Sequence, residues 1–255
     1  MLVPVSAIAS FQDGFGGSGL LRLAVVAGAV TLAFAGVARL LRGVTRGGAV
    51  AGALVSFLLY LGTGAGAFIT LIAVFIVTLG ATRVGYSQKQ RLGTAERGDG
   101  RTASQVLANL GVAAAAALAY LIVRDSALTL ACVAALAEAA ADTVSSEIGQ
   151  TASASARLIT TWERVPAGTD GGVSLSGTLA GTLAALLIAM VARLAGLLSW
   201  HAVVIPFVAA VAGMLFDSIL GAWLERRSLL NNDSVNFLST LTAAGIAAAI
   251  AIRAQ

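Results

Sequence analysis

Long apolar runs separated by short polar connections make up most of this chain. A helix that crosses a bilayer needs ~20 apolar residues, or fewer where it is short or broken. Eight candidate spans lie at about Leu20–Leu41, Gly48–Leu61, Ala65–Thr82, Ser104–Val123, Ala127–Ser145, Ser174–Ala195, Ala202–Trp223 and Val235–Ile252. None alternates polar and apolar residues as a barrel strand would, so we expect helices. The second run is short and flanked by glycines, so it either spans the membrane or is re-entrant.

The composition agrees with an integral membrane protein. Hydrophobic residues make up 58% of the 255 residues and charged residues 11%, whereas a soluble domain carries ~25% charged residues. The mean hydropathy is +0.91. We predict an all-α fold, a polytopic bundle of about seven to eight transmembrane helices. It forms one domain over residues 1–255, with residues 1–19 as an N-terminal surface segment.

Basic residues gather in every second connection between the predicted helices. The first connection holds Arg39, Arg42 and Arg46, and the third holds Arg83, Lys89, Arg91, Arg97 and Arg101. Short cytoplasmic loops carry such an excess. We therefore predict that loops 83–103, 146–173 and 225–235 are cytoplasmic and that both termini lie outside the cell (inner) membrane. The net charge of +4 is then an orientation signal, and nothing indicates nucleic-acid binding.

Four acidic residues lie in or at the ends of apolar helices: Glu138, Asp142, Glu147 and Asp217. Acids within a membrane are costly and usually line a site or a pathway. Glu138 and Asp142 are four residues apart and share a helix face. Glu147 joins that face only if the helix ends or unwinds near Ser145.

Two glycines lie on the same helix face as Asp217. Gly213, Asp217 and Gly221 repeat every four residues, so a neighbouring helix could approach Asp217 closely. Carboxylates gathered in this way suit Mg²⁺, which uses few protein carboxylates and shares substrate phosphates. Alternatively, the acids pair with arginines or are protonated and hydrogen-bonded between helices.

Two polar loops follow the acidic helices. Residues Gly168–Gly172 precede the sixth predicted helix, where glycine amides could converge on an anion and Asp170 could bind metal or cap the helix. Residues Asn231–Asn236 begin the last helix, where Asp233 and Asn236 could bind Mg²⁺ or a ribose. Both loops could instead be plain helix caps.

Lys89 stands out because it is the only lysine among 16 basic residues. An ammonium is a compact point charge that arginine does not replace, so Lys89 could contact a phosphate. The other reading is that a single lysine has survived by chance.

Three long motifs resemble a known membrane family. They are Ala141–Gly149, Val165–Ser174 and Leu230–Asn236, and Gly80–Lys89 and Gly100–Asn109 also follow the pattern. The family is domain of unknown function 92, whose best-understood members look like the phytyl-phosphate kinase of the chloroplast vitamin E pathway. The match covers nearly the whole chain. This sequence differs from the family pattern at two places: the position of Asp170 varies within the family, and Leu110 stands where glycine is common.

The resemblance implies an enzyme that phosphorylates an isoprenyl monophosphate to the diphosphate. It also implies kinship with polyprenol kinases and membrane cytidylyltransferases. The phosphoryl donor would be a nucleoside triphosphate, with CTP as one candidate. Family positions carried over are Lys89, Asn109, Asp142, Ser146, Glu147, Thr169, Gly171, Gly172, Asp217, Asn232, Asp233 and Asn236.

From residues and resemblance together we predict a Mg²⁺-dependent lipid kinase. The expected catalytic residues are Lys89, Asp142, Glu147 and Asp217, and the expected metal ligands are Asp142, Glu147, Asp217 and Asp233. The expected substrate and nucleotide contacts are Arg83, Asn109, Ser146, Thr169, Asp170, Gly171, Gly172, Asn232 and Asn236. The expected partners are an isoprenyl monophosphate, a nucleoside triphosphate and the lipid bilayer, and a homodimer is left open. The alternatives are a CTP-dependent cytidylyltransferase and an ion-coupled transporter.

Overall fold

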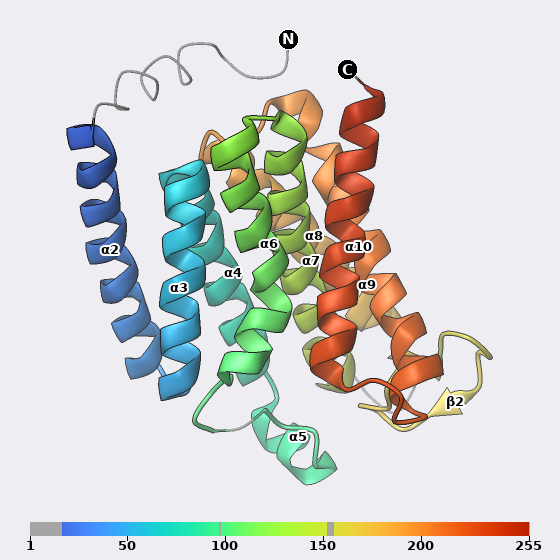
Figure 1. Ribbon diagram of the computed structural model, residues 1–255. Helices are drawn as coiled ribbons and strands as arrows, with labels where there is room; N and C mark the ends of the chain where they lie inside the picture. The colour runs from blue at the N-terminus through green and yellow to red at the C-terminus, as the bar shows by residue number, and fades with distance from the viewer. Residues whose placement is uncertain (1–16, 97, 152–155, 255) are drawn as a thin grey trace.

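The structure is a computed structural model, and it describes residues 17–96, 98–151 and 156–254. Eight helices in this part of the chain are long and apolar enough to cross a membrane. They are formed by α2 Gly17–Leu40, α3 Arg46–Thr63, α4 Ala65–Arg83, α6 Ala103–Val123, α7 Ser126–Thr151, α8 Leu175–Leu194, α9 Val204–Leu220 and α10 Asn232–Arg253. The span formed by α9 includes the turns on both sides of it and runs over Trp200–Glu225. They run up and down side by side (Figure 1). The predicted all-α membrane bundle is confirmed.

Several helix boundaries differ from the predicted ones. The second apolar run forms one continuous helix of 18 residues, α3, rather than a re-entrant turn, and the Thr45 hydroxyl caps its start by accepting a hydrogen bond from the Gly48 amide. Helix α7 continues to Thr151, so the loop predicted from residue 146 begins later. Of the predicted surface segment 1–19, residues 1–16 lie outside the described residues, and residues 17–19 already belong to α2.

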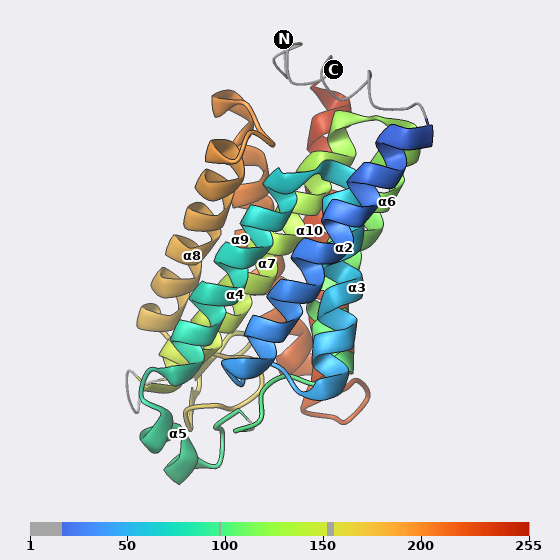
Figure 2. The same cartoon turned by 90° about the vertical axis from the view of Figure 1, so that its left-hand side faces the viewer.

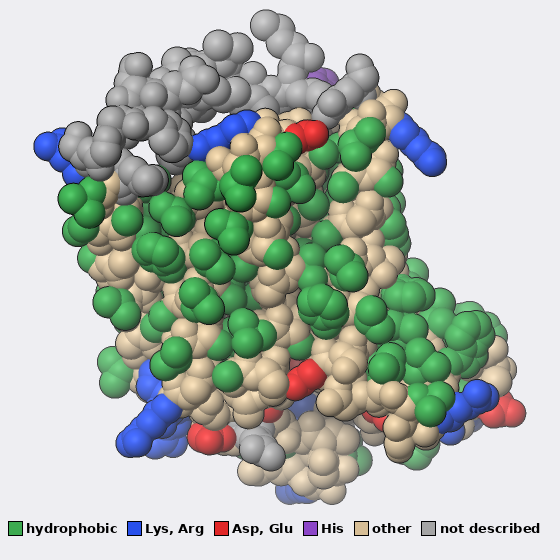
Figure 3. Space-filling view, in the orientation of Figure 1, with side chains coloured by type: hydrophobic (Ala, Val, Ile, Leu, Met, Phe, Trp, Pro, Cys, Tyr) green, Lys and Arg blue, Asp and Glu red, His purple; other side chains and the backbone are tan. Residues whose placement is uncertain are grey.

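Helix α7 is the centre of the bundle. In its most apolar stretch 83% of the residues are buried, whereas in the same kind of stretch of α2, at the edge of the bundle, 17% are buried. It packs against α4, α6, α8, α9 and α10, as the two views show (Figures 1 and 2). Its alanine-rich sequence allows this, because small side chains let helices approach closely. Large apolar side chains instead cover the outside of the bundle, and charges lie toward its two ends (Figure 3).

Glycines mark the closest approaches to α7. A Cβ atom at Gly181 would lie 2.6 Å from the Ala141 carbonyl oxygen, and one at Gly177 would lie 2.5 Å from the Ser145 carbonyl oxygen. These glycines therefore serve contacts inside the chain rather than between subunits. A Cβ atom at Gly213 would lie 2.7 Å from the Glu138 side chain. The predicted close approach beside Asp217 is thus made by α7.

The irregular segments gather at one end of the bundle, which we call the loop end (Figure 1). They are helix α5 Tyr86–Leu92, strands β1 Ala156–Leu158, β2 Arg164–Val165 and β3 Gly172–Val173, and the π-helical turn η2 Gly221–Glu225. The strands form an antiparallel sheet in the order β2-β1-β3. The short 3-10 turn η1 Trp200–Ala202, the start of α2 and the end of α10 lie at the opposite end.

Candidate functional site

A polar pocket of about 190 Å³ opens at the loop end beside α7. We call it the acid pocket. Its walls come from α7, the glycine loop 168–172, the end of α9 with η2, and the start of α10. It is lined by Asp142, Ser145, Ser146, Gly149, Gln150, Ala156, Gly168, Thr169, Asp170, Gly171, Gly172, Ser174, Asp217, Ser218, Gly221, Glu225 and Asn232. Segments up to 90 residues apart in sequence therefore meet at one site, since Asp142 and Asn232 both line it.

Two carboxylates face each other in this pocket. The side chains of Asp142 on α7 and Asp217 on α9 interact directly, and Glu138 lies within electrostatic reach of both. One carboxylate oxygen of Asp217 and one of Glu138 are buried without a hydrogen-bond partner. Buried acceptors without partners are costly. The arrangement is therefore suited to a cation or to protons shared between the acids.

The glycine loop is fixed tightly against η2. Gly171 has a φ of +73°, which favours glycine, and a Cβ atom there would collide with the backbone of Ala222. The Gly171 carbonyl accepts a hydrogen bond from the Ile159 amide (3.0 Å), and the Gly172 amide donates to the Thr169 carbonyl (2.8 Å). Single π turns inside helices are frequent at functional sites. The loop and the π turn thus hold each other in place at the mouth of the pocket.

The glycine loop precedes α8, as predicted. Val173 and Ser174 lie between the loop and the helix, and the Ser174 hydroxyl caps α8 by accepting from the Gly177 amide (3.1 Å). The Gly172 amide is already used in a turn. A bound anion would therefore meet the loop through its remaining polar groups rather than through the α8 N-terminus.

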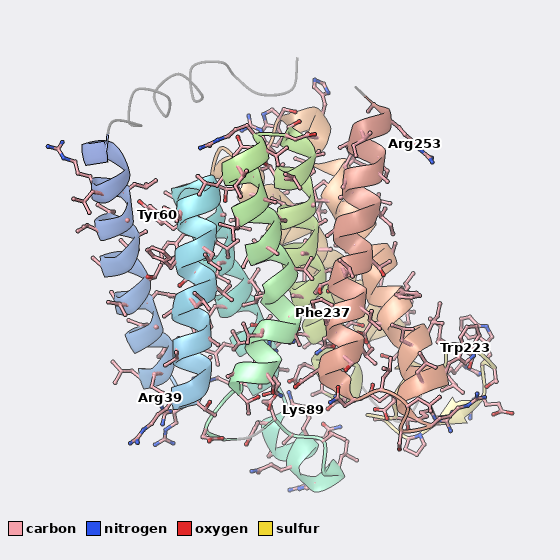
Figure 4. All side chains as sticks on the ribbon, viewed as in Figure 1. Arg39, Tyr60, Lys89, Trp223, Phe237 and Arg253 are labelled. Atoms are coloured by element: carbon pink, nitrogen blue, oxygen red, sulfur yellow. The ribbon has the colours of Figure 1, made fainter. Side chains whose placement is uncertain are left out.

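Lys89 and Glu147 form a buried ion pair away from the acid pocket. The Lys89 ammonium is fully enclosed and donates to the Thr82 carbonyl (2.7 Å), the Ala81 carbonyl (3.2 Å) and the Glu147 carboxylate (2.5 Å). An ammonium has three donors, so none remains for a phosphate. Figure 4 shows Lys89 pointing from α5 into the bundle. This position of Lys89 indicates a structural role rather than the predicted phosphate contact.

Glu147 was expected to reach the face of Asp142 only if α7 ended or unwound near Ser145, and α7 does neither. The helix continues past it to Thr151. Five residues of helix turn the side chain by roughly 140° from Asp142, which directs Glu147 to Lys89 instead. The expected metal role of Glu147 is therefore not supported by its position.

Of the residues expected from the loop Asn231–Asn236, one lines the acid pocket. Asn232 lines the acid pocket, whereas Asp233 and Asn236 do not. Asn231 rather than Asp233 caps α10, because its side chain accepts from the Ser234 amide (2.9 Å). The side chain of Asn236 is buried within the helix packing. Neither Asp233 as a metal ligand nor Asn236 as a nucleotide contact is placed in the pocket.

Arg83 and Asn109 line a second cavity of about 400 Å³, which lies mainly between α2, α3, α4 and α6 and also touches Ala139 of α7. We call it the α2–α6 cavity. Its interior is apolar, and Arg42, Arg83 and Arg101 stand at the loop end. This cavity was not predicted, because no local pattern reports a space between helices. Glu225 in the acid pocket was not predicted either, although Glu225 continues the four-residue spacing of Gly213, Asp217 and Gly221.

The residues present fit a magnesium ion that two carboxylates and a substrate share. No set of three or more His, Cys, Asp or Glu side chains in the described part of the chain could hold a metal on its own. Mg²⁺ commonly takes one or two carboxylates and completes its shell with phosphate oxygens and water. Asp142 and Asp217 offer this pair, with an oxygen of Asp217 still unpartnered.

Comparison with known proteins agrees with the sequence motifs. Residues 29–244 match the family described as "Integral membrane protein DUF92". The chain belongs to the DUF92 family. The matched residues of this DUF92 protein include every segment that forms the acid pocket, so the pocket lies within the family's shared part.

Its relatives come from bacteria, archaea and plants. The DUF92 protein is 32% identical over 195 residues to the uncharacterized membrane protein sll0875 of Synechocystis, covering 74% of this chain and 75% of that one. It is 33% identical over 200 residues to the uncharacterized membrane protein MJ0933 of Methanocaldococcus jannaschii (76% and 80%). It is 31% identical over 209 residues to the chloroplastic protein VTE6 of Arabidopsis thaliana (78% and 63%). No solved structure matches.

Proposed function

We propose that this DUF92 protein is a Mg²⁺-dependent kinase that converts an isoprenyl monophosphate to the diphosphate with a nucleoside triphosphate. The observation that carries the proposal is the acid pocket. Two facing carboxylates, a fixed glycine loop and Asn232 meet there at the end of the membrane helices. Phosphoryl transfer depends mainly on positioning and on neutralising charge, and the pocket offers groups for both.

In the proposed reaction, an oxygen of the lipid phosphate attacks the γ-phosphorus of the nucleotide. A P–O bond forms to that oxygen, the bond from the γ-phosphorus to the bridging oxygen breaks, and the electron pair leaves with the nucleoside diphosphate. The acceptor phosphate is already ionised, so the pocket needs no strong base. When bound, Mg²⁺ would supply charge neutralisation, and Asp142 and Asp217 would hold it. Thr169, Asp170 and Asn232 also line the pocket, and in this proposal they would contact the phosphates and the nucleotide.

Family membership supports the lipid substrate. The best-understood members of DUF92 look like a phytyl-phosphate kinase, and the chain matches that family over residues 29–244. The placement of the pocket at the end of the bundle also suits a lipid whose tail lies between helices and whose phosphate reaches the interface.

We also propose that the loop end faces the cytoplasm, where nucleotides are, and that both termini face outward across the cell (inner) membrane. Arginine-rich connections favour this orientation. Labelling of single introduced cysteines on intact cells tests it: a cysteine at Gln88 should be protected from an impermeant reagent, and one at His201 should react. The reverse pattern would contradict the orientation.

A substrate screen tests the kinase. The purified protein is incubated with isoprenyl monophosphates of several lengths, Mg²⁺, and ATP, CTP, GTP or UTP, and lipid and nucleotide products are identified by mass spectrometry. We expect an isoprenyl diphosphate together with a nucleoside diphosphate, and no product from an Asp142→Asn variant that still folds. Release of pyrophosphate with a cytidylylated lipid would identify a cytidylyltransferase instead.

A second measurement distinguishes the proposed kinase from a transporter. Flux of a solute through liposomes without nucleotide, together with no lipid product in the screen, would replace the kinase by a transporter.

A further inference from the structure

The α2–α6 cavity has the size and lining of a binding site for one lipid tail. Its volume of about 400 Å³ lies in the range of ~300–1,000 Å³ typical of small-molecule sites. Phe34, Leu71 and Phe75 contribute apolar walls, and Phe34 packs edge-on against Phe75 with ring centroids 5.4 Å apart. Gly52 faces the cavity from α3, and a Cβ atom there would meet nothing within 4 Å. The space is therefore kept open by the absence of a side chain.

The loop end of this cavity is positively charged. Its charged lining residues are Arg42, Arg83, Arg101 and Glu96, which is three positive charges against one negative charge. The Arg101 backbone is held by the connection from α2 to α3, because its amide donates to the Gly43 carbonyl (3.1 Å) and its carbonyl accepts from the Thr45 amide (2.9 Å). An apolar cavity that ends in arginines fits an amphiphile with an anionic head.

Arg101 connects this cavity to the acid pocket. Its guanidinium donates to the Thr143 hydroxyl on α7 (3.1 Å) and lies within electrostatic reach of Asp142. Ala139 lines the cavity and Asp142 lines the acid pocket, and three residues of helix span only ~4.5 Å along the axis. The two spaces therefore flank the same turn of α7.

We propose that the α2–α6 cavity binds a single-chain lipid phosphate, with the chain between α2, α3, α4 and α6 and the phosphate at Arg42, Arg83 and Arg101. The identity of this lipid as the phosphate acceptor rests on the proposed function, but the binding does not need nucleotide or metal. The lipid phosphate then approaches Asp142 and Asp217 from the Arg101 side of α7, while the nucleotide occupies the acid pocket.

Photolabelling of the full chain in nanodiscs tests this assignment directly. The probe is a twenty-carbon isoprenyl monophosphate with a photoreactive diazirine at the tail end, added without nucleotide and without Mg²⁺. We expect the label on α2, α3 or α4 residues of the cavity. Labelling confined to the outer, lipid-facing surface or to the glycine loop would overturn the assignment. This readout needs no variant, so a misfolded mutant cannot obscure it.

Affinity measurements with matched variants give an independent answer. Gly52→Leu fills the cavity and should weaken binding about tenfold or more, whereas Gly80→Leu, on the exposed side of α4 where a Cβ atom also meets nothing, should leave it within about twofold. Arg42→Gln should weaken binding about tenfold, since it removes a charge-assisted hydrogen bond to the phosphate. Arg91→Gln, on the exposed face of α5, is its control. Equal affinities within either pair would contradict the assignment.

Three further ligands identify the chemistry that is recognised. The isoprenyl alcohol lacks the phosphate, inorganic phosphate lacks the tail, and phosphatidate carries two chains, so each should compete poorly with the probe. Equal competition by phosphatidate would overturn the single-chain claim. If the probe binds in the cavity but the substrate screen shows no phosphoryl transfer, the kinase proposal is refuted and the lipid site stands. If the screen shows phosphoryl transfer but the photolabel lies elsewhere, the lipid site is refuted and the kinase proposal stands.

Discussion

The buried ion pair between Lys89 and Glu147 gives the sharpest prediction about this protein. It joins α5 to the ends of α4 and α7 at the loop end. Replacing Lys89 by Met keeps a long apolar stem but removes the ammonium. The Glu147 carboxylate and two backbone carbonyls then lose their donor in a place where water does not reach Lys89.

The size of the effect follows from this enclosure. Removing one partner of a buried ion pair costs ~3–5 kcal/mol, because the other charge stays buried without compensation. At ~2–4 °C per kcal/mol for a chain of this size, the unfolding temperature should fall by about 6–20 °C. Lys89→Arg should also destabilise, by ~1–3 kcal/mol, since the larger planar guanidinium does not fit a fully filled site.

Thermal unfolding in detergent, followed by fluorescence-detected size exclusion, measures these shifts. The double variant Lys89→Met/Glu147→Leu removes both charges and should regain at least half of the loss. Arg91→Met is the control on α5, and its exposed position predicts a change within ~0.5 kcal/mol. In the folded fraction of Lys89→Met, nucleotide affinity should stay within about twofold of wild type.

The refuting result is specific. If Lys89→Met unfolds at the wild-type temperature but loses nucleotide affinity, Lys89 acts on a phosphate and its enclosed geometry does not describe the working protein. If the double variant is no more stable than Lys89→Met alone, the pairing with Glu147 is not the source of the stability.

Three further predictions concern the acid pocket and the helix contacts. Asp217→Asn should abolish phosphoryl transfer yet unfold at or above the wild-type temperature, because it removes the repulsion between two facing carboxylates. A lower unfolding temperature would show that this repulsion does not destabilise the fold. Gly171→Ala and Gly93→Ala change glycines with φ of +73° and +72°, so both should lose ~1 kcal/mol to backbone strain. Only Gly171→Ala should lose at least ~1 kcal/mol more and reduce activity, because only its Cβ meets neighbouring backbone; equal unfolding midpoints would disprove that contact. Gly181→Leu should prevent a monodisperse fold in detergent because its side chain would strike α7, whereas Gly245→Leu enters open space and should be tolerated; similar elution profiles for the two would place Gly181 at the surface.

The sequence by itself determined the membrane helices and part of the site. Apolar run length is a local property, so eight spans could be counted from residues alone, and the structure has eight such helices. The cost of an acid in hydrocarbon is equally local, and it singled out Asp142 and Asp217. The small residues around Asp217 also predicted that a neighbouring helix approaches it closely.

The tertiary structure alone decided which polar groups face one another. The same acidic signal pointed to Glu147, but its direction depends on α7 remaining helical to Thr151 and on α5 bringing Lys89 to its side. Lys89 was singled out correctly as unusual, yet its partners are two carbonyls and a carboxylate from other helices. No local pattern encodes the α2–α6 cavity either, because it is space left by four helices and by the missing side chain of Gly52. Helices are fixed by hydrogen bonds within one segment, whereas enclosure, pairing and empty volume arise only when distant segments pack together.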